Sequence, residues 1–192
     1  MEEVKVTGKF DVVILGGSAG SLQVLMKMLP LLNAPLSFAF VIILHRKNTE
    51  DKTLEQLIDL KSTTNVKEVE DKVLLTPGSI YIAPSDYHLL FEKENYLSLD
   101  ASEKVNYSRP SIDVSFESAA EIYKSKVLGI LLSGANADGT KGMQSIKELG
   151  GTIIVQDPET AETPFMPINA IKFANPDYIL TVEEIITFLN EI

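Results

Sequence analysis

The sequence has no cysteine, few histidines and a shortage of basic residues, and each shortage removes a class of function. Without cysteine the 192-residue chain can form no disulfide, no thiolate metal site and no cysteine nucleophile. It carries 17 lysines and arginines against 27 aspartates and glutamates, a formal net charge of −10. A field of that sign repels phosphate backbones, so we expect no nucleic-acid partner. With two histidines in the chain, a histidine base must be His45 or His88.

Long hydrophobic runs are also missing. No stretch approaches the roughly 18 consecutive apolar residues of a membrane-spanning helix. The first ten residues, MEEVKVTGKF, are charged and lack the apolar run of a signal peptide. We therefore expect no membrane insertion and a cytoplasmic location, with which the absence of cysteine agrees.

Short apolar runs alternate with helical patterns along the chain. Runs over 10–15, 38–44, 127–132, 152–155 and 178–180 predict buried strands. Periodic apolar residues predict helices over 18–32, 53–60, 110–123, 137–149, 166–173 and 182–189. Turn residues break up 64–100, which predicts small strands or a hairpin there. The whole predicts an α/β fold: a three-layer α/β/α sandwich with a doubly wound, mainly parallel sheet, a small antiparallel hairpin and one domain over 1–192.

Polar residues with chemical meaning follow three of the predicted strands. Ser18 lies in the glycine-rich segment after the first strand, His45 follows the second, and Asp138 follows the strand that ends at Leu132. In open α/β sheets ligands bind outside the carboxyl ends of the strands. We therefore expect Ser18, His45 and Asp138 to converge on one edge of the sheet.

That set of side chains fits acyl-transfer chemistry. A serine hydroxyl needs an imidazole to take its proton, and a carboxylate to orient the imidazole and stabilise its cation. Residues 16–20 also match the G-x-S-x-G elbow, in which small neighbours allow a tight turn that exposes the serine. The backbone N–H of Ala19 is the natural first donor to an oxyanion. The chemistry requires no metal and no cofactor.

Other interpretations remain open for each of these residues. Ser18 could be the N-cap of its helix, and Asp138 the N-cap of the helix that follows it. The glycine-rich turn could instead hold a phosphate or nucleotide in a non-catalytic binding module. Against that, Leu15 stands where the first glycine of G-x-G-x-x-G belongs, and the lysine of a P-loop is missing. We expect a structural or rim role for His88.

Several motifs in order resemble one known family. They are Ile14 to Gly20, Pro77 to His88, Arg109 to Val114, Gly134 to Gly139, and Met166-Pro167. Together they resemble the catalytic domain of CheB-type chemotaxis protein-glutamate methylesterases, from about Asp11 to the C-terminus. The resemblance implies an α/β/α sandwich with the nucleophile at Ser18, the histidine at His45 and the aspartate at Asp138.

The same resemblance implies a reaction and partners. The reaction is hydrolysis of glutamate γ-methyl esters on the cytoplasmic helices of methyl-accepting chemotaxis receptors, with methanol released, and in some members deamidation of receptor glutamines. Family motifs surround Arg109 and Met166, so both are candidates for the substrate cleft; a helix-start charge and a core side chain are the alternatives. We expect no receiver domain in this chain, and regulation by a separate protein or a trimmed domain.

The chain departs from the family pattern beside the expected nucleophile and aspartate. Ser21 replaces a glycine after the elbow, where it would narrow the room at the helix start. Ala135 and Asn136 replace a methionine and a glycine before Asp138. These changes keep open an esterase of the same fold that acts on another substrate.

Overall fold

A seven-stranded sheet forms the middle layer of the protein in the computed structural model, which describes residues 10–45 and 53–192. Its order is β10-β9-β8-β1-β2-β5-β3, and every neighbouring pair is parallel. The strands are β1 (Val12–Gly17), β2 (Ala39–Leu44), β3 (Val66–Glu68), β5 (Ile80–Ile82), β8 (Val127–Leu131), β9 (Thr152–Gln156) and β10 (Tyr178–Leu180). The central strands β1, β2 and β8 are buried along their whole length, which is why their sequences are almost continuously apolar.

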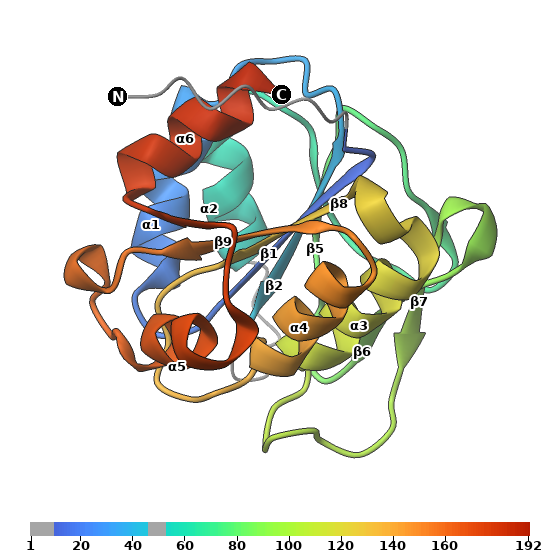
Figure 1. The fold of residues 1–192 in the computed structure, drawn as a ribbon. Helices are drawn as coiled ribbons and strands as arrows, with labels where there is room; N and C mark the ends of the chain where they lie inside the picture. The colour runs from blue at the N-terminus through green and yellow to red at the C-terminus, as the bar shows by residue number, and fades with distance from the viewer. Residues whose placement is uncertain (1–9, 46–52) are drawn as a thin grey trace.

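Helices cover both faces of this sheet (Figure 1). One layer contains α1 (Ser21–Met28), α2 (Thr53–Lys61) and α6 (Val182–Glu191); the other contains α3 (Ile112–Tyr123), α4 (Thr140–Glu148) and α5 (Phe165–Ala174). Short 3-10 helices span Leu29–Leu31, Lys93–Asn95, Lys124–Lys126 and Pro158–Thr160. Successive side chains of β1 point to opposite layers, with Val13 and Leu15 in one core and Val12 and Ile14 in the other. The predicted three-layer sandwich is confirmed.

A second, smaller sheet forms within the turn-rich middle segment, residues 64–100. It is antiparallel, in the order β4 (Val73–Leu74), β7 (Tyr96–Asp100) and β6 (His88–Phe91). The Ser115 hydroxyl of α3 donates to the Leu89 carbonyl at 2.8 Å and ties this sheet to the helix. The small strands or hairpin expected here are present as this sheet, and the buried strand β5 of the same segment extends the main sheet.

Two helix starts differ from the prediction. Residues 18–20 form a turn, closed by the Ser21 N–H donating to the Ser18 carbonyl at 3.0 Å, so α1 starts at Ser21 instead of Ser18. Gly20 is its N-cap at φ 84°, a left-handed backbone that glycine adopts without strain. Pro110 is not the first residue of α3 as predicted, because Ser111 is the N-cap and Ile112 the first helical residue.

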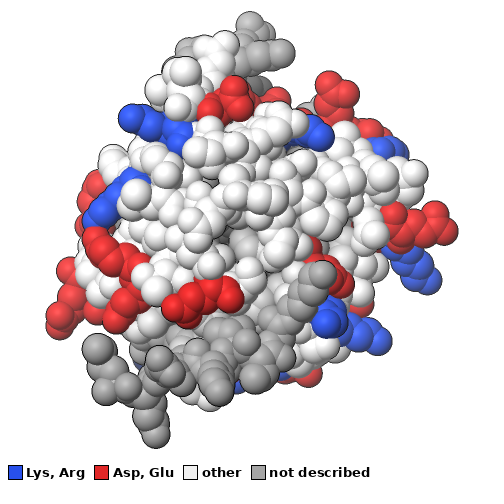
Figure 2. Space-filling view, turned by 90° about the horizontal axis from the view of Figure 1, so that it is seen from above, with Lys and Arg blue, Asp and Glu red and all other residues white. Residues whose placement is uncertain are grey.

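Acidic side chains gather along the rim of the face seen in Figure 2, whereas its basic side chains are scattered and its middle is largely uncharged. This distribution accompanies the net charge of −10. Within residues 10–45 and 53–192 no helix has both the length and the apolar character needed to cross a bilayer.

Candidate active site

The parallel pairing of β1 with β2 places Ser18 and His45 beside one another. Gly17 is in register with Leu44, and the His45 N–H donates to the Gly17 carbonyl at 3.1 Å. On the other side, the Ser18 N–H donates to the Ser133 carbonyl at 2.9 Å, next to the end of β8. The backbones of Ser18 and His45 therefore leave the sheet at adjacent positions of one edge. A hydrogen bond between the Ser18 hydroxyl and the His45 imidazole stays a prediction.

The side chains of Ser21 and Ser133 support the turn that carries Ser18. The Ser21 hydroxyl is fully buried and donates to the Ser133 carbonyl at 2.7 Å, and the Ser133 hydroxyl donates to the Ala19 carbonyl at 2.7 Å. Ser21 therefore braces the turn from inside, and the expected narrowing at the helix start stays a prediction. Because Gly20 caps α1, the interpretation of Ser18 as the helix N-cap is wrong.

His45 and Asp138 form a buried pair. The Nε2 atom of His45 lies 2.7 Å from Oδ2 of Asp138, and their side chains are 11% and 0% exposed. An ionised carboxylate only accepts hydrogen bonds, so Nε2 carries the proton and donates it. In the neutral ring Nδ1 is then unprotonated and free to act as a base.

Asp138 also anchors the start of α3. The backbone N–H groups of Ile112 and Asp113 donate to its two carboxylate oxygens at 2.7 and 3.0 Å, and the Ser111 hydroxyl donates at 2.9 Å. The positive end of the helix dipole reinforces these bonds. The interpretation of Asp138 as the N-cap of α4 is wrong, because Gly139 is that cap.

These contacts keep the Asp138 carboxylate ionised. Burial acts to raise its pKa, but the hydrogen bond from His45 and the backbone N–H groups of Asp113 and Ile112 outweigh burial and hold the pKa below its usual value. A charged carboxylate in this position stabilises a protonated imidazole.

A second buried carboxyl group, Asp113, lies beside the first. Burial and the negative charge of Asp138 raise its pKa to about 6, against the opposing hydrogen bond from the Gly142 N–H at 2.9 Å. The Asn106 side-chain amide joins the two carboxyl groups, with Nδ2 3.0 Å from Oδ2 of Asp113 and 3.5 Å from Oδ1 of Asp138.

The remaining predicted residues lie around this centre. His88 is buried, accepts the Ser111 N–H at Nδ1 (3.1 Å) and lies 2.9 Å from the Glu103 carbonyl through Nε2, so both ring nitrogens are used in structural bonds. Arg109 donates through Nη1 to two backbone carbonyls of the preceding loop. Met166 is fully buried, and a Cβ on Gly134 would lie 2.5 Å from its methyl carbon. Substrate contact by Arg109 or Met166 stays a prediction.

Sequence reasoning missed the residues that hold Asp138. Ser111 carried one signal in the sequence, because a serine directly before a helical pattern is a typical N-cap. In the structure it is the N-cap of α3, and its side chain accepts the Val114 N–H. Asn106 carried none, because it lies in a loop far along the chain from Asp138. Asn136, a departure from the family pattern, accepts the Asp138 N–H at 3.0 Å and so supports the turn.

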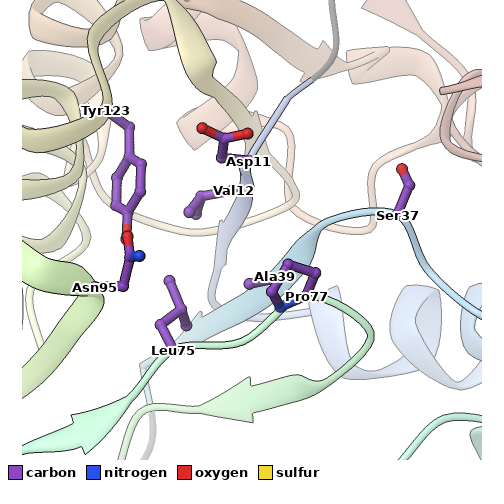
Figure 3. A pocket seen from close by; sticks show the side chains of 8 residues that line it. All are labelled: Asp11, Val12, Ser37, Ala39, Leu75, Pro77, Asn95 and Tyr123. Carbon is purple, nitrogen blue, oxygen red and sulfur yellow. The ribbon is translucent and has the colours of Figure 1, made fainter.

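Other features of the described residues point to no further centre of this kind. Across 10–45 and 53–192 no three or more His, Asp or Glu side chains group closely enough to hold a metal ion. A cavity of about 270 Å³ lies at the opposite end of β1 from Ser18, between Asp11, Leu75, Asn95 and Tyr123 (Figure 3). It therefore belongs to the other edge of the sheet.

Comparison with known proteins shows to which family the chain belongs. A family model described as CheB methylesterase matches residues 13–189. The chain belongs to the CheB methylesterase family. A protein-glutamate methylesterase/protein-glutamine glutaminase of Thermotoga maritima is 38% identical over 185 residues, 94% of this chain and 53% of that protein. The crystal structure of a Thermotoga maritima CheB methylesterase catalytic domain superposes with a TM-score of 0.90 at 36% identity, covering 96% of this chain and 99% of that one.

Coverage differs among the CheB relatives. A protein of Leptospira interrogans is 40% identical over 176 residues, which are 92% of this chain and 91% of that protein. The chain spans about half of the Thermotoga relative and 45% of a Maricaulis maris protein-glutamate methylesterase/protein-glutamine glutaminase. The sequence resemblance to CheB methylesterases is thus confirmed at the level of family and fold.

Proposed function

We propose that this protein hydrolyses glutamate γ-methyl esters on methyl-accepting chemotaxis receptors, with Ser18 as nucleophile, His45 as general base and Asp138 as the carboxylate that orients it. The observation that carries the proposal is the buried pair of His45 Nε2 and Asp138 Oδ2, 2.7 Å apart, at the edge where Ser18 follows β1. Membership of the CheB family supplies the substrate class.

The reaction follows from these groups. Nδ1 of His45 takes the hydroxyl proton of Ser18 as its Oγ attacks the ester carbonyl, and Asp138 stabilises the resulting imidazolium. The Ala19 N–H is the first oxyanion donor. The imidazolium then protonates the departing methoxide, methanol leaves, and water repeats the sequence on the acyl-enzyme. With a glutamine substrate the same steps release ammonia, which agrees with the glutaminase activity named for the Thermotoga relative.

The binding partner and the subcellular location follow from the same proposal. The substrate would be the cytoplasmic helical part of a receptor, so the enzyme would act in the cytoplasm. We infer that a separate regulatory protein controls it.

The geometry favours hydrolysis over the alternative of a phosphate-binding module. Such a module uses backbone N–H groups at a helix start and has no need of a buried imidazole–carboxylate pair. A thermal-shift screen with nucleotides distinguishes the two, since a ligand at 100 times its dissociation constant stabilises by about 2.7 kcal/mol. A large shift would favour the binding module.

The direct test is methanol release from a receptor fragment that carries glutamate methyl esters. We expect wild-type protein to release methanol and Ser18→Ala to be slower by at least about 10³-fold, as for other serine hydrolases that lose their nucleophile. Equal rates would refute the Ser18 assignment. A panel of small esters in the same assay separates this function from an esterase with another substrate: hydrolysis of small esters alone would favour the latter.

A further inference from the structure

The loop between β7 and α3, residues 101–110, contains an unusual turn at Val105 to Ser108. We call this segment the strap. Val105 and Ser108 pair through two backbone hydrogen bonds of 3.2 and 2.9 Å, and the central residues Asn106 and Tyr107 have φ values of 50° and 62°. Two central residues at positive φ are typical of a type I′ turn, whose preferred sequence is Asn-Gly. Tyr107 therefore occupies the position at which glycine is favoured.

The base of the strap is fixed. Nη1 of Arg109 donates to the carbonyls of Ala101 and Ser102 at 2.9 and 2.7 Å. The buried ring of His88 holds the Glu103 carbonyl at 2.9 Å. The Arg109 bonds thus join the two ends of the strap to each other, and His88 attaches the segment before its turn to the body of the protein.

The turn itself is tied to the candidate active site. The Asn106 amide donates to Asp113 at 3.0 Å and reaches Asp138 at 3.5 Å, so the residue before Tyr107 contacts the carboxylate that holds His45. In Figure 1 the strap is the yellow-green loop that projects at the lower edge of the molecule, beyond α3 and β6. The turn of the strap therefore lies next to the carboxylate that orients the candidate general base.

Tyr107 contributes little to the fold. Its side chain is 98% exposed, and a bulky residue at positive φ is strained. Tyrosine is enriched in the residues that dominate binding energy at interfaces, because it buries a large area at low conformational cost. The position thus carries a strained aromatic residue where stability alone favours glycine.

We propose that Tyr107 is a docking residue that packs against the helical receptor segment carrying the esterified glutamate. This inference rests on the proposed function and names the partner surface of the same site. With a net charge of −10 the protein gains no general electrostatic attraction for a helix that carries glutamates, which favours a contact through uncharged surface. Tyr107 and Val105, which is 37% exposed, supply such a surface on the strap.

The test combines affinity with stability. In a Ser18→Ala background, which holds substrate without turnover, the Kd for a methylated helical receptor fragment is measured with and without Tyr107→Gly. We expect Tyr107→Gly to weaken binding about tenfold, as for a typical interface hot spot. The same change creates the Asn-Gly sequence that a type I′ turn prefers, so the melting temperature should equal or exceed that of the Ser18→Ala protein. Tyr96→Ala is the matched control, an exposed tyrosine at the far end of β7, and should leave Kd unchanged.

Each outcome decides the inference. An unchanged Kd in the Tyr107→Gly variant, or no binding of the fragment to either protein, overturns it. Weaker binding with a melting temperature that falls sharply also overturns it, because the loss would then reflect damage to the fold. If Tyr107→Gly weakens binding while the wild-type protein releases no methanol, docking stands and the proposed hydrolysis fails.

Discussion

Replacing Asp138 with alanine should remove stability as well as activity, because this carboxylate serves the start of α3 and His45 together. The backbone N–H groups of Ile112 and Asp113 lose their acceptor in a fully buried position. A buried donor left unsatisfied costs about 1–3 kcal/mol, so the two together predict a loss of about 2–6 kcal/mol. With a urea dependence of about 2 kcal/mol per molar, the midpoint of unfolding should fall by about 1–3 M.

The assay is urea unfolding followed by circular dichroism, with Ser18→Ala as the control. Ser18 donates its backbone N–H to Ser133, a bond that the alanine variant keeps, so its midpoint should match the wild type. Both variants should release methanol at least about 10³-fold more slowly than the wild type. A wild-type midpoint for Asp138→Ala would refute the claim that the carboxylate anchors α3.

Two further predictions concern a buried carboxyl group and the turn after Ser18. Asp113 has a folded-state pKa of about 6, above its unfolded value, so between these two values the folded protein holds a proton that the unfolded chain releases. The free energy of unfolding should therefore fall as the pH rises from about 4 to about 6, by at most about 3 kcal/mol. Asp113→Asn should flatten this pH dependence in urea titrations, and an unchanged dependence would contradict the assignment. Gly20→Ala should lower both the melting temperature and methanol release, because its Cβ would lie 2.7 Å from the Glu162 Cβ at φ 84°. Gly150→Ala is the control with a similar φ of 88° but its nearest neighbour 3.7 Å away; equal losses in the two variants would mean that crowding at the turn is unimportant.

The layers of the fold could be predicted because the central strands are buried on both faces. A continuous apolar run such as Phe40 to Leu44 has few alternatives in an α/β chain, and its strand was predicted to within one residue. The start of α1 was wrong by three residues, since Ser18 looks like an N-cap in sequence, whereas the turn is set by the backbone angle at Gly20. Composition and periodicity do not encode that angle.

The sequence predicted the candidate site through strand ends, but not its support. Ser18 and His45 follow adjacent parallel strands, so their proximity follows from topology. The bonds from Ile112 and Asp113 to Asp138 depend on how α3 meets the loop after β8, a tertiary contact across 25 or more residues. Local patterns could not show it, and they equally could not show that Asn106 reaches both carboxyl groups.

The central claim is that Ser18 carries the acyl group during turnover, with its proton taken by His45. The most direct measurement is mass spectrometry of the protein after treatment with a fluorophosphonate, which labels serines that a neighbouring base activates. The account predicts a single adduct on the peptide containing Ser18, formed rapidly in wild-type protein and far more slowly in His45→Gln. An adduct on another residue, or labelling of Ser18 at the same rate without the imidazole, would contradict it.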